Sequence, residues 1–311
     1  MLQINGILGE IHFSFYTNAT LYALIRMPVM HVFEPAWRCI YCGRIPANRK
    51  SLGKEHILPL SLGGTTILPR ASCTLCSEIT RAFEETCART IFGVTRLAGN
   101  FPTRNPEKRP TMLTTGGTVD GVETEIDTPV EHHPIAGALL QFEPPGLLFP
   151  RPSTNTFKCR VRYYHFEKLG TPETRQNAFK PKYTSKFLVT PFAKMLAKVA
   201  HSLAVGQFGF ESHEWLLPDV IVGNALNLPD YVGSVDWLDG GDEEQLLHPS
   251  GEPEMLWRPS TSLTLQEIVA NDGTPYVCVD IGLFFDFSPK YRVLVAKSKP
   301  GILYSTEQQL G

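Results

Sequence analysis

Apolar positions recur with helical spacing in two segments of the chain. The first runs from Ser77 to about Arg89, and its apolar face carries Ile79, Phe83 and Cys87. An amphipathic helix is therefore predicted there, with Cys87 in the core and not among metal ligands.

The second helical segment is predicted to run from Thr190 to about Val205. Threonine suits the N-cap and Pro191 suits the first helical position. The side opposite the apolar face carries three polar residues, which predicts a solvated face: Lys194, Lys198 and His201. A cradle for phosphate is the alternative interpretation of these residues. A further helix is predicted over 211–222.

Period-two alternation predicts strands in the C-terminal two thirds of the chain. One strand is expected around 161–166, and a β-meander is expected over 263–297. The tripeptide Asn271-Asp272-Gly273 is typical of a hairpin turn, and Ser288-Pro289-Lys290 marks the next turn. With the two helices, this pattern predicts an α+β fold. No internal repeat, nucleotide loop or nucleophile elbow is found in this part.

Composition supports a folded chain rich in turns. Of 311 residues, 42% are hydrophobic and 19% are charged, and glycine and proline each number 25. No run of 18 apolar residues occurs, and the first 30 residues lack a basic segment followed by a cleavage site. A cytoplasmic protein with no membrane partner is therefore expected.

Charge is distributed unevenly along the chain. Residues 31–111 contain 12 Lys and Arg against 6 Asp and Glu, a balance of +6. Residues 112–311 contain 16 basic against 24 acidic side chains, a balance of −8. A polyanion would therefore bind the first of these regions, because contacts to phosphate need Lys and Arg.

Four of the seven cysteines form two close pairs, Cys39-x-x-Cys42 and Cys73-x-x-Cys76. A disulfide framework would be denser and would not leave an odd cysteine. Two such pairs predict one structural Zn²⁺ held by four thiolates, whereas a redox dithiol is the alternative for either pair alone. A long insertion separates the pairs, and it contains the adjacent residues Glu55 and His56.

The order of these motifs resembles that of the HNH endonucleases. The matching stretches are Cys39-Ile-Tyr-Cys42-Gly43, Glu55-His56-Ile57 with Pro59, Gly63-Gly64, and Leu68-Pro69-Arg70-Ala71-Ser72-Cys73 with Cys76. In the free-standing bacterial HNH proteins that are most similar, the next helix carries a threonine and a glutamate, matched by Thr80 and Glu84. The resemblance covers roughly residues 36–112.

This resemblance implies a ββα-metal fold that hydrolyses phosphodiester bonds in DNA. His56 would be the general base, because an imidazole can accept a proton from water at neutral pH. Glu55 would be a ligand of a catalytic Mg²⁺ or Mn²⁺. Ser77 and Glu84 would complete that ion's ligands, and the zinc knuckles would be structural.

Two positions depart from the wider HNH pattern. Many members carry asparagine where this chain has Ser77, and a second asparagine where it has Leu68. Glu84 and Thr80 are candidates to replace the lost oxygen, or Ser77 caps the helix. The alternative is a catalytically degenerate protein that still binds zinc and nucleic acid.

Two groups of basic residues are candidates for contact with DNA. The first lies in the zinc unit and the second in a proline-bounded arm: Arg44, Arg49, Lys50 and Lys54, then Arg104, Lys108 and Arg109. A solvated loop and an ordinary linker are the respective alternatives.

Three segments are predicted: an N-terminal extension over 1–30, an HNH nuclease domain over 31–112, and an α+β accessory domain over 113–311. Metal-dependent cleavage of DNA is the leading interpretation, with RNA left open. A protein-interaction module acting through the acidic C-terminal region is a third alternative. Double-strand cleavage would need a homodimer or two sequential nicks, because one ββα site cuts one strand.

Overall fold

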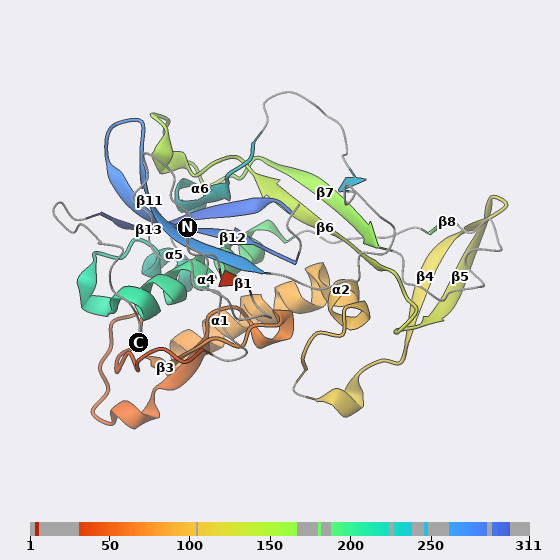
Figure 1. Ribbon diagram of the computed structural model, residues 1–311, viewed down its shortest axis with the longest axis horizontal. Helices are drawn as coiled ribbons and strands as arrows, with labels where there is room; N and C mark the ends of the chain where they lie inside the picture. Colours follow the sequence, from red (N-terminus) through yellow and green to blue (C-terminus); the bar gives the residue numbers. More distant parts are fainter. Residues whose placement is uncertain are drawn as a thin grey trace.

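The computed structural model describes residues 4–5, 31–103, 105–166, 180–181, 188–223, 227–237, 246–247, 261–284 and 288–298. Helices and antiparallel strands both contribute, which confirms the predicted α+β class (Figure 1). The N-terminal extension lies outside the described residues except for Ile4–Asn5. Within the described part, no helix combines the length and the apolar character that a membrane span requires.

A hairpin and a helix form the unit that contains the paired cysteines. Strands β2 (Gly53–His56) and β3 (Ile67–Ser72) pair antiparallel, and α1 (Thr74–Thr86) follows directly. A π-helical turn (Cys87–Ile91) and α2 (Gly93–Ala98) continue the chain. Short 3₁₀ helices precede and interrupt the hairpin at Arg49–Ser51 and Leu60–Leu62. Cys87 is fully buried, as the helical wheel predicts.

The predicted β-meander is present in a five-stranded sheet. Strands β11 (Ser262–Val269), β12 (Pro275–Gly282) and β13 (Lys290–Lys297) pair antiparallel in sequence order. Gly273 has φ +85° at the β11–β12 turn, a conformation that glycine adopts at low cost. Strands β1 (Ile4–Asn5) and β9 (Val232–Ser234) complete the two edges of this sheet.

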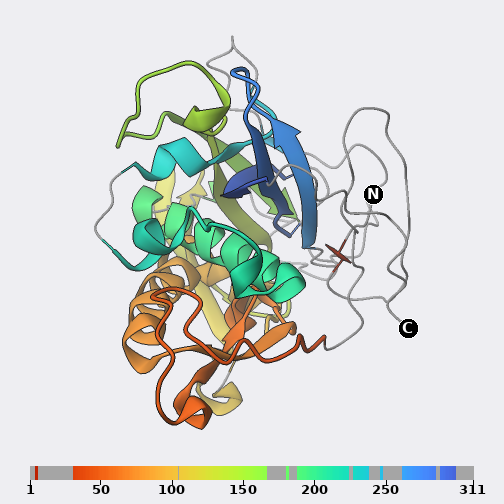
Figure 2. The same cartoon turned by 90° about the vertical axis from the view of Figure 1, so that its left-hand side faces the viewer.

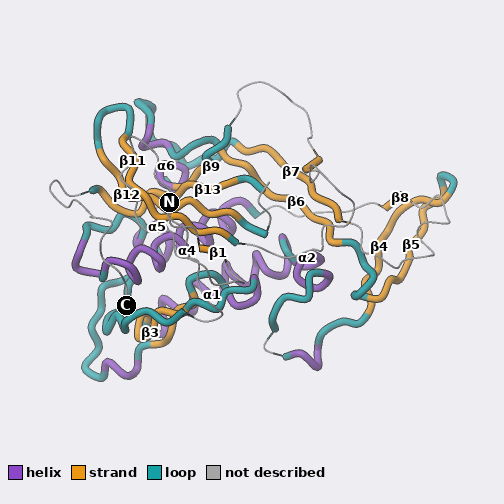
Figure 3. The backbone as a smooth tube through the Cα atoms, in the orientation of Figure 1, coloured by secondary structure: helices purple, strands orange, loops and turns teal. Residues whose placement is uncertain are grey.

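Two further sheets have three strands each; the one with β6 and β7 lies beside the five-stranded sheet, whereas the one with β4 and β5 projects at the far end of the molecule (Figure 3). One contains β6 (Ile135–Phe142), β7 (Cys159–Phe166) and β10 (Leu246–Leu247), so the strand expected over 161–166 is confirmed. The other contains the projecting hairpin β4 (Met112–Val119) and β5 (Val122–Pro129), with β8 (Lys180–Pro181). Two 3₁₀ turns flank these sheets, at Pro106–Lys108 and Gly146–Leu148.

Helix α4 (Val189–Phe208) lies between the cysteine-containing unit and the five-stranded sheet (Figure 2). It contacts α1 on one side and β12 and β13 on the other. Side chains on every side of the helix are therefore buried, and one hydrophobic core extends from Phe33 to Ala296. The domain boundary at 112/113 stays a prediction.

The prediction that α4 has a solvated face is wrong. Lys198 and His201 have no exposed surface, and Lys194 is half-buried. The reason is that α4 is covered by protein on both sides, a long-range fact that helical periodicity does not report. The start is also different: Thr190 lies inside the first turn, and Leu188 is the N-cap.

The predicted helix over 211–222 is only partly present. A 3₁₀ turn (Phe210–Ser212) and α5 (Pro218–Val222) are separated by an extended segment, in which Trp215 forms a β-bridge to Ala296. Pro218 begins α5 because proline suits a first helical turn and resists the continuation of a preceding helix. Helix α6 (Leu228–Tyr231) then leads into β9.

His201 should make the stability of the fold sensitive to acid. Its Nε2 donates to the carbonyl of Ile40 at 2.7 Å, and burial lowers its pKa to about 4. The unfolded chain therefore binds one more proton between pH 6.5 and pH 4, and stability is lost as pH falls through this window. Between pH 7 and pH 5 the loss from this group should be about 2 kcal/mol.

The variant His201→Gln tests this effect, because glutamine retains an N–H donor but does not titrate. Urea unfolding at both pH values should show a smaller loss of stability in the variant. Acid release of a metal ion from the cysteines would affect both proteins alike, so equal losses would contradict the role of His201.

Candidate functional site

The four paired cysteines converge at one point. Their Sγ atoms all lie within 4.8 Å of one another, and those of Cys42 and Cys73 are 3.8 Å apart. Four thiolates at about 2.3 Å from a tetrahedral Zn²⁺ would be about 3.8 Å apart. The arrangement therefore fits a structural zinc ion held by Cys39, Cys42, Cys73 and Cys76.

Local backbone geometry brings the two pairs together. Gly43 has φ +67° and donates its N–H to the carbonyl of Cys39, which closes a tight turn behind the first pair. Cys73 is the N-cap of α1, and Cys76 lies in the first turn of that helix. Burial raises the pKa of the Cys39 and Cys76 thiols, so a bound cation would be needed to hold them as thiolates.

A cavity of about 390 Å³ is lined in part by α1, the helix that also carries Cys76. It is lined by residues from β2, α1 and the turn leading to α2. Among them are four residues that match the HNH pattern, Glu55, His56, Thr80 and Glu84, and also Ser77, where the chain departs from that pattern. The fold thus brings these residues together from two separate segments.

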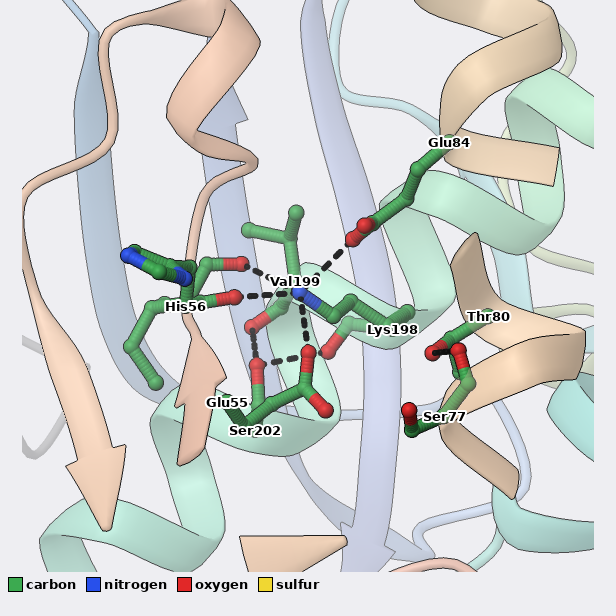
Figure 4. A network of polar contacts seen from close by, with 9 residues as sticks. Glu55, His56, Ser77, Thr80, Glu84, Lys198, Val199 and Ser202 are labelled. Carbon is green, nitrogen blue, oxygen red and sulfur yellow. Dashed lines mark hydrogen bonds and ion pairs between the residues drawn. The ribbon is translucent and has the colours of Figure 1, made fainter. Parts of the chain in front are cut away.

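Strand β2 is irregular where Glu55 and His56 lie. The register with β3 shifts between Gly53 and Glu55, and the strand ends at His56. Glu55 is buried, His56 is half-buried, and both line the cavity. The imidazole of His56 points away from Lys198, whereas its backbone carbonyl points toward that lysine (Figure 4).

Lys198 of α4 contacts two of these residues, Glu55 and Glu84, and this contact was not predicted from the sequence. Its Nζ lies 2.8 Å from Glu55 Oε1 and 2.8 Å from Glu84 Oε1. The same Nζ donates to the carbonyl oxygens of His56 and, at 3.3 Å, Ile57 (Figure 4). The available signal was that α4 is apolar nearly all round, which is typical of a buried helix.

Electrostatics keep this lysine charged. Burial lowers the pKa of Lys198, but the two carboxylates outweigh burial, so its pKa is raised above the ordinary value. Burial, reinforced by the charges of Glu55 and Glu84, also raises the pKa of the neighbouring Tyr41 well above its usual value. At neutral pH the site therefore contains an ammonium and a neutral phenol.

The expected catalytic ion does not fit this arrangement. Glu55 and Glu84 would be its carboxylate ligands, but a cation already lies between them. Ser77 lies inside α1, three residues after the helix begins, so it is not the helix cap. The Thr80 hydroxyl donates to the Ser77 carbonyl at 3.2 Å. The described residues therefore give no support to the expected catalytic Mg²⁺ or Mn²⁺.

The basic residues selected from sequence occupy several different places. Lys54 lines the cavity, whereas Arg44, Arg49 and Lys50 are exposed outside its lining. Lys108 is also exposed, and Arg104 lies outside the described residues.

Arg109 does not extend along a groove. Its guanidinium donates to the carbonyl of Phe101 and to the side chain of Asn100, so this part of the arm folds back on its own loop. The three arginines that do line the cavity were not selected from sequence: Arg81, Arg89 and Arg96. Arg96 is anchored by hydrogen bonds to Ser61 O at 2.7 Å and Ala88 O at 3.0 Å.

Comparison of the chain with protein-family models, with curated proteins and with solved structures finds no match.

Purified protein should contain about one zinc ion per chain, because the four thiols form one tetrahedral site. Cys73→Ser should lose the metal and unfold at lower temperature. Cys87→Ser is the matched control, because Cys87 is buried on the same helical segment but lies outside the cluster. Metal analysis by mass spectrometry and thermal unfolding measure both effects. A folded wild-type protein without zinc would refute the site.

Proposed function

We propose that the chain is an endonuclease of the HNH type that hydrolyses phosphodiester bonds in DNA. The observation that supports this most is the cavity, which Glu55 and His56 of the hairpin line together with residues of α1, the helix that also carries Cys76 of the four-cysteine cluster. The order of hairpin, helix and paired cysteines is the one that the resemblance implies.

The residues of the cavity suit a reaction at phosphate. His56 takes a proton from a water molecule as the water oxygen attacks phosphorus, and the P–O3′ bond breaks. The leaving oxygen receives a proton from solvent. Lys54, Arg81 and Arg89 line the opening and offset the charge of the phosphate. No step is assigned to a catalytic metal ion, because its carboxylate ligands bind Lys198.

A second candidate function is binding of nucleic acid without hydrolysis. Lys198 favours it, because the carboxylates that would hold a catalytic ion are already neutralised. Leu68 favours it too, since this buried side chain stands opposite Glu55 where many HNH proteins have asparagine.

Plasmid cleavage should separate the two candidates. The wild-type protein, loaded with zinc, should nick or linearise plasmid DNA, and His56→Ala should reduce the rate by at least about 100-fold, as expected for loss of a general base. His132→Ala is the matched control, because His132 lies in the β5–β6 turn outside the cavity lining. Assays with Mg²⁺, with Mn²⁺ and without either ion identify any added-metal requirement.

Absence of cleavage together with intact binding of DNA would favour the second candidate. Cleavage that His56→Ala leaves unchanged would exclude His56 as the base.

The arginines of the cavity should contribute to binding of DNA under either candidate. Arg81→Ala and Arg89→Ala should each weaken binding. Each should also reduce the slope of log K against log salt by about 0.9, because one phosphate contact releases about one counterion. Arg44→Ala is the matched control, since Arg44 is exposed outside the cavity lining. Fluorescence anisotropy at several salt concentrations measures this; an equal effect of all three variants would contradict the assignment.

A further inference from the structure

The ammonium of Lys198 has the surroundings of a bound cation. Two carboxylate oxygens and two backbone carbonyl oxygens approach it, from Glu55, Glu84, His56 and Ile57. Carboxylates and carbonyls are the ligands that hard divalent ions prefer. An ammonium has only three hydrogens to donate, so four oxygens exceed its donors.

The dimensions of this oxygen shell match a nitrogen cation. Both carboxylate distances are 2.8 Å, within the usual range of about 2.7–2.9 Å for a charged N–H donating to a carboxylate. Mg²⁺ needs about 2.0–2.1 Å and Ca²⁺ about 2.3–2.6 Å. A divalent ion at the same place would require the shell to contract after the lysine had left.

Moving the ammonium of Lys198 out of this position would cost free energy. Lys198 has no exposed surface, whereas Glu55 is 7% and Glu84 is 19% exposed at the side chain. Lys198 belongs to α4, and this helix packs against both α1 and the five-stranded sheet. Withdrawal of the ammonium would leave Glu55 buried without a counter-charge, which is strongly unfavourable.

We propose that Lys198 is the resident cation of the Glu55–Glu84 pair: its ammonium takes the position between these carboxylates that a divalent ion would occupy, and it excludes divalent ions from the pair. The oxygens of the pair form a latent metal site that becomes available only when the lysine is removed. The role concerns the cation site itself and holds whether or not the cavity hydrolyses DNA.

Binding of Mn²⁺ to the zinc-loaded full-length protein tests this, with free Mn²⁺ followed by electron paramagnetic resonance. The wild type should have no Mn²⁺ site that depends on Glu55. Lys198→Ala should bind Mn²⁺ at least about tenfold more tightly, because removal of one positive charge leaves two carboxylates facing a space of suitable ligand type. Lys198→Ala combined with Glu84→Gln should lose this gain.

Lys194→Ala is the matched control. Lys194 lies one turn earlier on the same helix, and its Nζ donates to the carbonyl of Gly223 at 3.3 Å. This variant should bind Mn²⁺ no better than the wild type. An equal gain in both lysine variants would overturn the proposal.

The wild type decides the question even where Lys198→Ala does not fold. A saturable Mn²⁺ site in the wild type that Glu55→Gln abolishes would show that the lysine yields to a divalent ion, and the proposal would be wrong. No nucleic acid is present in this assay. Its failure is therefore distinguishable from failure of the proposed nuclease function, which only the plasmid assay tests.

Discussion

The structure depends on a single buried positive charge. Lys198 comes from α4, Glu55 from the hairpin and Glu84 from α1. The ammonium contacts both carboxylates, and all three groups are largely buried. Removal of one partner from a buried ion pair costs about 3–5 kcal/mol, because the remaining charge is left uncompensated. The final packing of the hairpin, α1 and α4 therefore depends on all three, and Glu55 and Glu84, which line the cavity, are at the same time part of the interface with α4.

Local signals predicted local structure well. The spacing of Cys39, Cys42, Cys73 and Cys76 predicted one cluster, because a tetrahedral ion accepts only a few loop geometries. The tripeptide Asn271-Asp272-Gly273 predicted the β11–β12 turn, since glycine relieves the cost of positive φ there. These features need few residues, and each carries its own physical constraint.

Long-range pairing was the part that periodicity did not reveal. A lysine on one side of a helix is normally a sign of solvent, and only the fold places Glu55 and Glu84 opposite Lys198. The same holds for the basic residues. Their number predicted a basic region, but which arginines line the cavity depends on the geometry of α1 and α2. The guanidinium of Arg109 instead donates hydrogen bonds to its own loop. The charges of a segment can be counted from its sequence, but their partners depend on the fold.

The position of α4 in the chain has a consequence for biosynthesis. The hairpin and α1 leave the ribosome about 100 residues before Lys198, and at about 5–20 residues per second this interval lasts about 5–20 s. During that time two carboxylates lack their counter-charge and the apolar surface that will contact α4 is uncovered. A metal ion at the four cysteines, which emerge early, would hold the hairpin to α1 through this interval. The nascent chain would then close in two steps in a fixed order, first at the metal site and then at α4.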